Sequence, residues 1–202
     1  MIASVERAII TRLHAAASQN VLGYPLRAES YGGQLDSENE LAKIANSLPR
    51  ALVTCTGVGK ATDRGSRYLE EATFAVLCVA RSLRNERSTR HGGLAGEVGT
   101  YQMRHDIMTL LCGQTLGLRD DIQPLIPHGS RILFNGMLRS MAVSIVAVEF
   151  KTSWLVEPAA DGSDASSMPG DAGAGITDFT LLDGSWDVPV PAIRDEVALH
   201  KE

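Results

Sequence analysis

The sequence predicts a mixed α/β (α+β) fold, in which two or three helices flank a mainly antiparallel sheet. Two apolar runs carry this prediction, Ala72 to Arg81 and Met137 to Lys151. In each run both alternating sets of side chains are apolar at the centre, so each strand is expected to be covered on both faces. In the second run these sets are Met141, Val143, Ile145 and Ala147 on one face and Ala142, Val146 and Val148 on the other.

Three segments have the apolar spacing of amphipathic helices. The first carries Ile2, Val5, Ile9, Leu13 and Ala16, with Ser4 expected as its cap. The second begins at the capping box of Ser37 and Glu40 and stops before Pro49. The third is expected to begin at Thr100 as its cap and to end at Gly113 or Gly117. Its apolar face is expected to hold Tyr101, Met108, Leu111 and Cys112.

The remaining strands are expected around turns. Residues 51–56 and 68–81 form an antiparallel hairpin in this prediction, and residues 57–67 form its long tip. The segment Gly23 to Gly33 is too rich in Gly and Pro for a long element and is expected to be a loop with room for a short strand. Asp120 to Gly129 is expected to be a connection that leads through Ile132 to Phe134 into the last long strand.

The composition divides the chain into three parts. Residues 1–156 are predicted to form an α/β domain. Residues 157–175 consist mainly of Ala, Asp, Gly, Ser and Pro, which predicts a flexible linker or loop. Residues 176–202 form a C-terminal extension, and its Phe179, Leu182 and Trp186 are expected to dock on the same or a neighbouring subunit.

Charge and composition exclude several classes of protein. The chain has 202 residues and a net charge of -5, which argues against a dedicated, sequence-specific nucleic-acid binder. The first 17 residues do not have the pattern of a signal peptide, and no apolar run reaches the roughly 20 residues that a membrane helix needs. We therefore expect a cytoplasmic protein without a membrane contact. The three cysteines are expected to be small buried hydrophobic residues.

The chemical motifs are weak, so we predict no enzyme, no catalytic residue, no metal and no cofactor. Gly57-Val58-Gly59-Lys60 departs from a phosphate-binding loop on both sides and is expected at a hairpin tip. Glu149 and Lys151 have the acid-x-lysine form of many metal-dependent nucleases, which remains a less favoured alternative. That alternative requires a second carboxylate near them.

The order of elements over about Ile2 to Glu157 resembles the tail terminator family of Mu-like contractile-tailed phages and prophages. The matching features include the N-terminal helix, the two hairpin strands and the Arg- and Asn-rich exit from Arg81 to Arg87. They also include Gly99-Thr100-Tyr101 at the start of the third helix, Leu111-Cys112-Gly113 near its end, and the strand that ends Glu149-Phe150-Lys151-Thr152.

The resemblance implies a virion structural protein that is assembled in the host cytoplasm and located in the tail. A homo-hexameric ring would cap the tail tube and sheath, stop tail polymerisation and present a surface for head-tail joining. The implied partners are copies of the chain, the tube protein, the sheath protein and head-tail connector proteins, and phage DNA would have room to pass through the ring lumen. The alternative among virion structural proteins is a head-tail connector or adaptor protein.

A row of four arginines supplies the predicted contact residues. Arg81, Arg84, Arg87 and Arg90 recur at every third residue, so an extended chain would align them on one side. Guanidinium groups in such a row suit carboxylates on a neighbouring subunit or on the tube. We therefore expect the segment Ser82 to Gly99 to make a functional contact.

Overall fold

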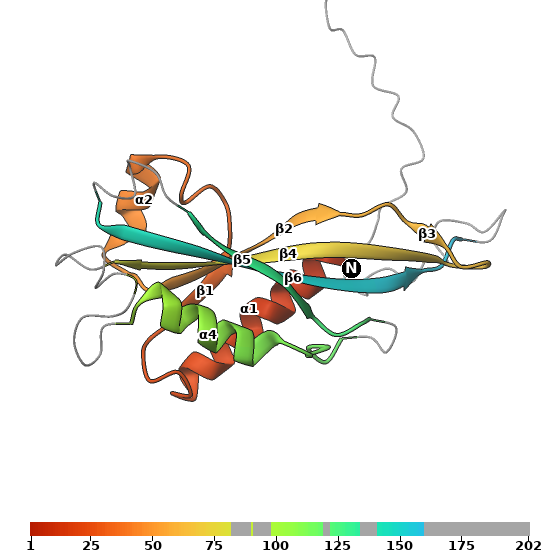
Figure 1. Ribbon diagram of the computed structural model, residues 1–202, viewed down its shortest axis with the longest axis horizontal. Coiled ribbons are helices and arrows are strands. Elements are labelled where there is room, and N and C mark those ends of the chain that lie inside the picture. The colour runs from red at the N-terminus through yellow and green to blue at the C-terminus, as the bar shows by residue number, and fades with distance from the viewer. Residues whose placement is uncertain (82–89, 91–97, 119–121, 134–140, 160–202) are drawn as a thin grey trace, which may run out of the picture. The chain divides into compact units, whose positions relative to one another are not determined.

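A computed structural model describes residues 1–81, 90, 98–118, 122–133 and 141–159 (Figure 1). The chain divides into two units, Met1–Pro158 and Ala159–Glu202, and the description below concerns the first. The predicted linker at 157–175 and the extension at 176–202 lie almost entirely outside the described residues, so the predicted division of the chain stays a prediction.

The centre of the first unit is a six-stranded sheet. Five strands have the order β1-β2-β4-β6-β5, and the sixth, β3, pairs with β4. Its strands are β1 (Arg27–Ser30), β2 (Arg50–Val58), β3 (Thr62–Asp63), β4 (Tyr68–Arg81), β5 (Ile126–Leu133) and β6 (Val143–Val156). All neighbours pair antiparallel except β1 and β2, which are parallel. The predicted mixed, mainly antiparallel α+β fold is therefore confirmed.

Helices cover the two faces of the sheet unequally. Figure 1 shows α1 (Ile2–Ser18) and α4 (Thr100–Leu111) together on one side, and the shorter α2 (Glu38–Ala45) on the other side near one end. None of these described helices is both long enough and apolar enough to cross a lipid bilayer. We call the face opposite α1 and α4 the open face.

Alternation along the strands creates two separate cores. Even-numbered residues of β4 and β6, such as Phe74, Val76, Val148 and Phe150, pack with α1 and α4 in the larger core. Odd-numbered residues such as Val79 and Ile145 pack with α2 in the smaller core. The expectation that both central strands are covered on both faces is confirmed only where α2 lies.

The central hairpin agrees with its prediction, whereas the last strand does not. The strand predicted from residue 68 to 81 is β4 with the same limits, and β2 extends its predicted range by one residue before and two after. Within the described residues, the run predicted to begin at Met137 joins the sheet at Val143, since residues 141 and 142 form a turn in which Ala142 has a φ of 55°. The strand continues beyond the predicted end at Lys151 to Val156, with Thr152 and Trp154 buried.

The sequence did not predict β5 from residue 126. Its side chains are exposed from Ile126 to Ile132, so it lacks the apolar alternation by which a strand is recognised. Pro127 and Gly129, which indicate a loop, flank an irregularity in its pairing with β6. An edge strand tolerates both residues because one side of it has no strand partner in the described part of the chain.

The helices confirm the apolar spacing but correct two caps. Ser37 accepts a hydrogen bond from the Glu40 amide, as the capping box predicted. Ser4 lies inside α1, whose N-cap is Met1, and Gly99 rather than Thr100 is the N-cap of α4. The predicted apolar face of α4 is wrong except for Leu111, because the buried face consists of Thr100, Met103, Ile107 and Leu111, while Tyr101 and Met108 are half-buried and Cys112 is exposed. Of the cysteines, Cys78 is buried as expected, Cys55 is half-buried, and Cys112 is exposed.

Candidate functional site

The open face contains an apolar groove that no described helix covers. The groove has a volume of about 310 Å³ and crosses β2, β4, β6 and β5. Its lining residues are Tyr31, Leu35, Thr54, Thr56, Ala75, Leu77, Arg131, Leu133, Ile145 and Ala147. The groove therefore lies beside the smaller core, where the cover by α2 stops.

Small side chains on the central strands form the floor of the groove. Ala75 of β4 and Ala147 of β6 point to the open face, and each is 2% exposed because its taller neighbours overhang it. On one side the groove is bounded by Tyr31 and Leu35 from the segment after β1, and on the other by Arg131 and Leu133 from β5. The surface is hollow because the sequence places alanine in the middle of the sheet.

Two acidic residues, Asp36 and Glu38, follow the groove wall of Tyr31 and Leu35 in the chain, and we call them the rim. The Tyr31 hydroxyl donates a hydrogen bond of 2.5 Å to Asp36. The pKa of Tyr31 is raised to about 12, chiefly by burial and secondly by this hydrogen bond. Glu38 follows in the first turn of α2 and is exposed. Neither Asp36 nor Glu38 has an ion-pair partner within the described residues.

The acid-x-lysine pair lies on the same open face, but each of its charges is paired. Arg131 donates to Glu149 at 2.6 Å, and Lys151 lies 3.0 Å from Glu71. Lys151 thus meets a second carboxylate, as the nuclease alternative requires, whereas Glu149 meets a guanidinium group. A cation at Glu149 would lie against this positive charge. The residues that the structure describes contain no group of three or more His, Cys, Asp or Glu suited to a metal ion.

The predicted arginine row is only partly described. Arg81 ends β4 opposite Val143, and Arg81 and Arg90 are each half-buried. The Nε atom of each is buried without a hydrogen-bond partner among the described residues. Arg84 and Arg87 lie outside the described residues, as do Phe179, Leu182 and Trp186, so the predicted contacts stay predictions.

Polar groups on the helix side support the fold. Tyr24 donates to Asp106 at 2.9 Å, and Gln102 donates to the same carboxylate at 2.8 Å. The pKa of Tyr24 is raised chiefly by burial and secondly by the negative charge of Asp106. Burial also raises the pKa of the Cys78 thiol. A thiol with a raised pKa is a poor nucleophile at neutral pH. His105, beside Asp106, is exposed and accepts a hydrogen bond from Thr109 only through its backbone carbonyl.

Sequence reasoning predicted that the central strands would be covered on both faces, but it did not locate the groove. The signal was present in the odd-numbered positions of β4 and β6, where the series of larger apolar residues stops at Ala75 and Ala147 beside the polar residues Thr73 and Glu149. The walls could not be predicted, because Tyr31, Leu35 and Leu133 come from segments expected to be loops or connections.

Comparisons with known proteins identify a family. The family described as "Bacteriophage Mu, Gp37" matches residues 1–155. No curated protein matches the chain. Among solved structures, a chain of the "Virion of native gene transfer agent (GTA) particle" has a TM-score of 0.44 and 13% identity, covering 77% of this chain and 98% of that chain. Since the family match extends over most of the sequence, the chain belongs to the bacteriophage Mu Gp37 family, a family of Mu-like phages.

Proposed function

We propose that the chain is a structural protein of the virion, the tail terminator, which caps the tail tube as a hexameric ring. In this role the ring stops the polymerisation of tube and sheath and presents a surface to the head connector. Membership of a Mu-like phage family supports a virion role. The observation that carries the ring is the uncovered apolar groove on the open face.

The physical argument starts from the central strands. A sheet packed by α1 and α4 on one face and only by the 8-residue α2 on the other leaves apolar groups in contact with water. A neighbouring subunit that covers this surface lowers the free energy of the assembly. Repeating such a contact between unlike surfaces closes a ring when the rotation between subunits permits it.

The chemistry of the described surface supports an assembly role over catalysis. Glu149 and Lys151 form ion pairs with Arg131 and Glu71, which gives them a structural use on the open face. We expect Glu149→Ala to leave any DNA-cleaving background of the purified protein unchanged. Metal-dependent cleavage that disappears in this variant would instead favour the nuclease alternative.

Deletion of the gene from the parent phage or prophage tests the proposed function. We expect tails of irregular, excessive length without heads, seen by negative-stain electron microscopy, and restoration of uniform tails when the chain is supplied from a plasmid. Headless tails of normal length would contradict a terminator and favour the connector or adaptor alternative. Normal particles would contradict both.

A further inference from the structure

The end of the sheet farthest from α2 presents apolar and basic side chains together. We call this end, residues 58–68 with Val156, the tip. Val58 and Tyr68 are each 42% exposed and Val156 is 40% exposed, and Tyr68 and Val156 are directly opposite each other on β4 and β6. Val58 pairs with Ala72, whose side chain points to the same face of β4 as Tyr68. Val58 therefore lies on the same face of the sheet as Tyr68 and Val156. Three of the larger exposed apolar side chains of the described chain therefore share one end of one face.

The charges at the tip are mostly positive. Lys60 and Arg64 are exposed and have no ion-pair partner within the described residues, while Arg67 lies 2.8 Å from Glu157. Asp63 accepts a hydrogen bond from the Gly65 amide within the same turn. Two cationic side chains thus remain available beside the exposed apolar residues.

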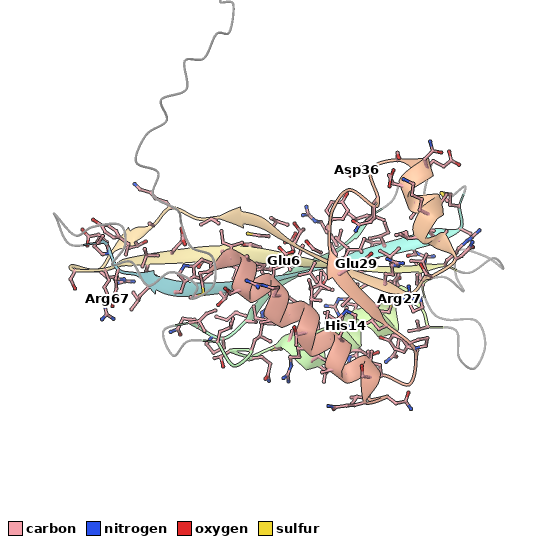
Figure 2. All side chains as sticks on the ribbon, turned by 180° about the vertical axis from the view of Figure 1, so that it is seen from behind. Glu6, His14, Arg27, Glu29, Asp36 and Arg67 are labelled. Atoms are coloured by element: carbon pink, nitrogen blue, oxygen red, sulfur yellow. The ribbon has the colours of Figure 1, made fainter. Side chains whose placement is uncertain are left out.

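The groove and its rim have the complementary properties. The groove is apolar along its floor, and Asp36 and Glu38 at its rim are exposed acids without an ion-pair partner in the described part of the chain. Figure 2 shows Arg67 at one end of the unit and Asp36 on the side of α2, so the basic tip and the acidic rim are far apart within one copy. The two surfaces can meet readily only when they belong to different molecules.

We propose that the tip of one copy docks in the groove of the next copy, with Lys60 and Arg64 facing Asp36 and Glu38. This contact joins two different surfaces, so it repeats from copy to copy and can close a ring. Burial of Val58, Tyr68 and Val156 supplies the apolar contact, while the opposite charges set its register and exclude other partners. The proposal rests on the proposed ring and names the surface that forms it.

Charge reversal tests the contact in two separate variants. The tip-reversed variant carries Lys60→Glu and Arg64→Glu, and the rim-reversed variant carries Asp36→Lys and Glu38→Lys. In each variant like charges would meet across the contact, so we expect about a tenfold or greater loss of capped tails in complementation of the gene deletion. Because Lys60 and Arg64 are exposed, we expect the tip-reversed variant to keep the melting temperature of the unmodified chain. The rim-reversed variant also loses the hydrogen bond from Tyr31 to Asp36, so a lower melting temperature is expected for it.

Co-expression of the two variants decides whether the contact joins different copies. When the variants alternate around a ring, every reversed tip faces a reversed rim and every unmodified tip faces an unmodified rim. We therefore expect co-expression to restore capped tails, and a tagged tip-reversed chain to purify together with an untagged rim-reversed chain. A chain that carries all four substitutions is also expected to form capped tails, and its tagged copies are expected to purify together with its untagged copies.

One control matches the tip-reversed variant. Arg7→Glu with Arg27→Glu makes the same change of charge as the tip reversal at exposed positions outside the tip and groove, and should have no effect. Tyr31→Phe removes the hydrogen bond to Asp36 without changing the charge of the rim, so its melting temperature measures the stability that the rim-reversed variant loses through that bond. A loss of assembly in the variant of Arg7 and Arg27 would overturn the assignment of the effect to the contact between tip and rim.

The result that overturns the proposal is the absence of rescue in the co-expression experiment. Retained copurification and capping in both single variants would overturn it too. If the groove instead holds the chain's own residues 160–202 or the tube protein, reversal of the rim is not repaired by reversal of the tip in another copy. A failure of the proposed function can be distinguished from a failure of this contact. Co-purification of the variants reports the contact whether or not the gene deletion changes tail length.

Discussion

At the scale of single residues, the best-defined polar contact inside the fold is a pair of hydroxyl groups. Thr100 of α4 and Ser144 of β6 are 3.1 Å apart, and both side chains are buried. Thr100, expected to cap the helix, instead links the start of α4 to the start of β6. Each hydroxyl satisfies the other in surroundings from which water is excluded.

Replacing one member of this pair is expected to destabilise the protein. Thr100→Val keeps the shape of the side chain but leaves the Ser144 hydroxyl unpaired, at a cost of about 1–3 kcal/mol in the free energy of unfolding. Urea denaturation measures this cost. The double variant Thr100→Val with Ser144→Ala should be less destabilised than the sum of the single variants. Strict additivity would mean that the two hydroxyls do not stabilise each other.

The raised pKa of Tyr31 predicts a loss of stability in alkaline solution. Its value rises from 10.0 to about 12 in the folded protein, chiefly by burial and by the hydrogen bond to Asp36. The protonated form therefore stabilises the fold fully below about pH 10, and this contribution is lost as the pH rises through about 12. Urea denaturation between these pH values should show a steeper loss of stability for the unmodified chain than for Tyr31→Phe. Equal slopes would contradict the shift.

At the scale of elements, α2 decides how much of the open face is exposed. Leu41 and Ile44 are its main contacts with the sheet, and they pack on Leu52, Val79, Val143 and Ile145. The helix has only 8 residues, so its stability depends on this packing more than on its own hydrogen bonds. Its capping box and its buried leucine are therefore both needed to hold one wall of the groove in place.

Leu41→Ala is expected to lower the free energy of unfolding by about 2–5 kcal/mol, because it leaves a cavity under α2. Leu41 is fully buried, whereas Asn39 of the same helix is exposed. Asn39→Ala should therefore change the stability by no more than about 0.5 kcal/mol. Chemical denaturation of the two variants gives the comparison, and similar effects would mean that α2 does not pack as described.

Elements with strong apolar spacing were predictable from the sequence. The limits of β4 agree with the prediction, as do the buried residues Val5, Ile9, Leu13 and Ala16 of α1, because these side chains alternate or recur with the period of the element. The edge strand β5 was not predictable, since its exposed residues carry no such period. The added length of β6 was also missed, because Glu149 and Lys151 carry charges on the open face, whereas Thr152 and Trp154 beyond them are buried.

The candidate site was less predictable than the fold. The sequence indicated apolar side chains on both faces of the central strands, but the groove combines β2, β4, β5 and β6 with the segment after β1. Its position depends on pairing between strands far apart in the chain, such as Ala75 with Glu149. The arginine row and the C-terminal aromatic residues remain predictions from sequence alone.

At the scale of the whole molecule, the C-terminal extension is expected to contribute to assembly. Its Phe179, Leu182 and Trp186 provide more apolar surface than a solvated tail tolerates. Truncation after Glu157 should therefore lower the melting temperature, reduce the yield of capped tails, or both. Calorimetry of the purified chain and electron microscopy of complemented tails measure the two effects. Unchanged values of both would make the extension dispensable.

The arginine row is expected to act in assembly rather than in folding. Replacing Arg84, Arg87 and Arg90 together by Ser should make capped tails scarce or over-long, while the isolated chain keeps its melting temperature. Arg90→Ser alone is the necessary control, because the Nε atom of Arg90 is buried. Normal tail length and normal head joining in the triple variant would leave the row without a function in assembly.

The central claim is that this chain forms the ring that ends the tail tube. Electron cryomicroscopy of intact particles, with density assigned by the fold of residues 1–158, tests it most directly. We predict six copies in one ring at the head-proximal end of the tube, with the tip of each copy in the groove of the next. A stable ring of another symmetry on the particle, or density for the chain away from the end of the tube, would contradict the claim.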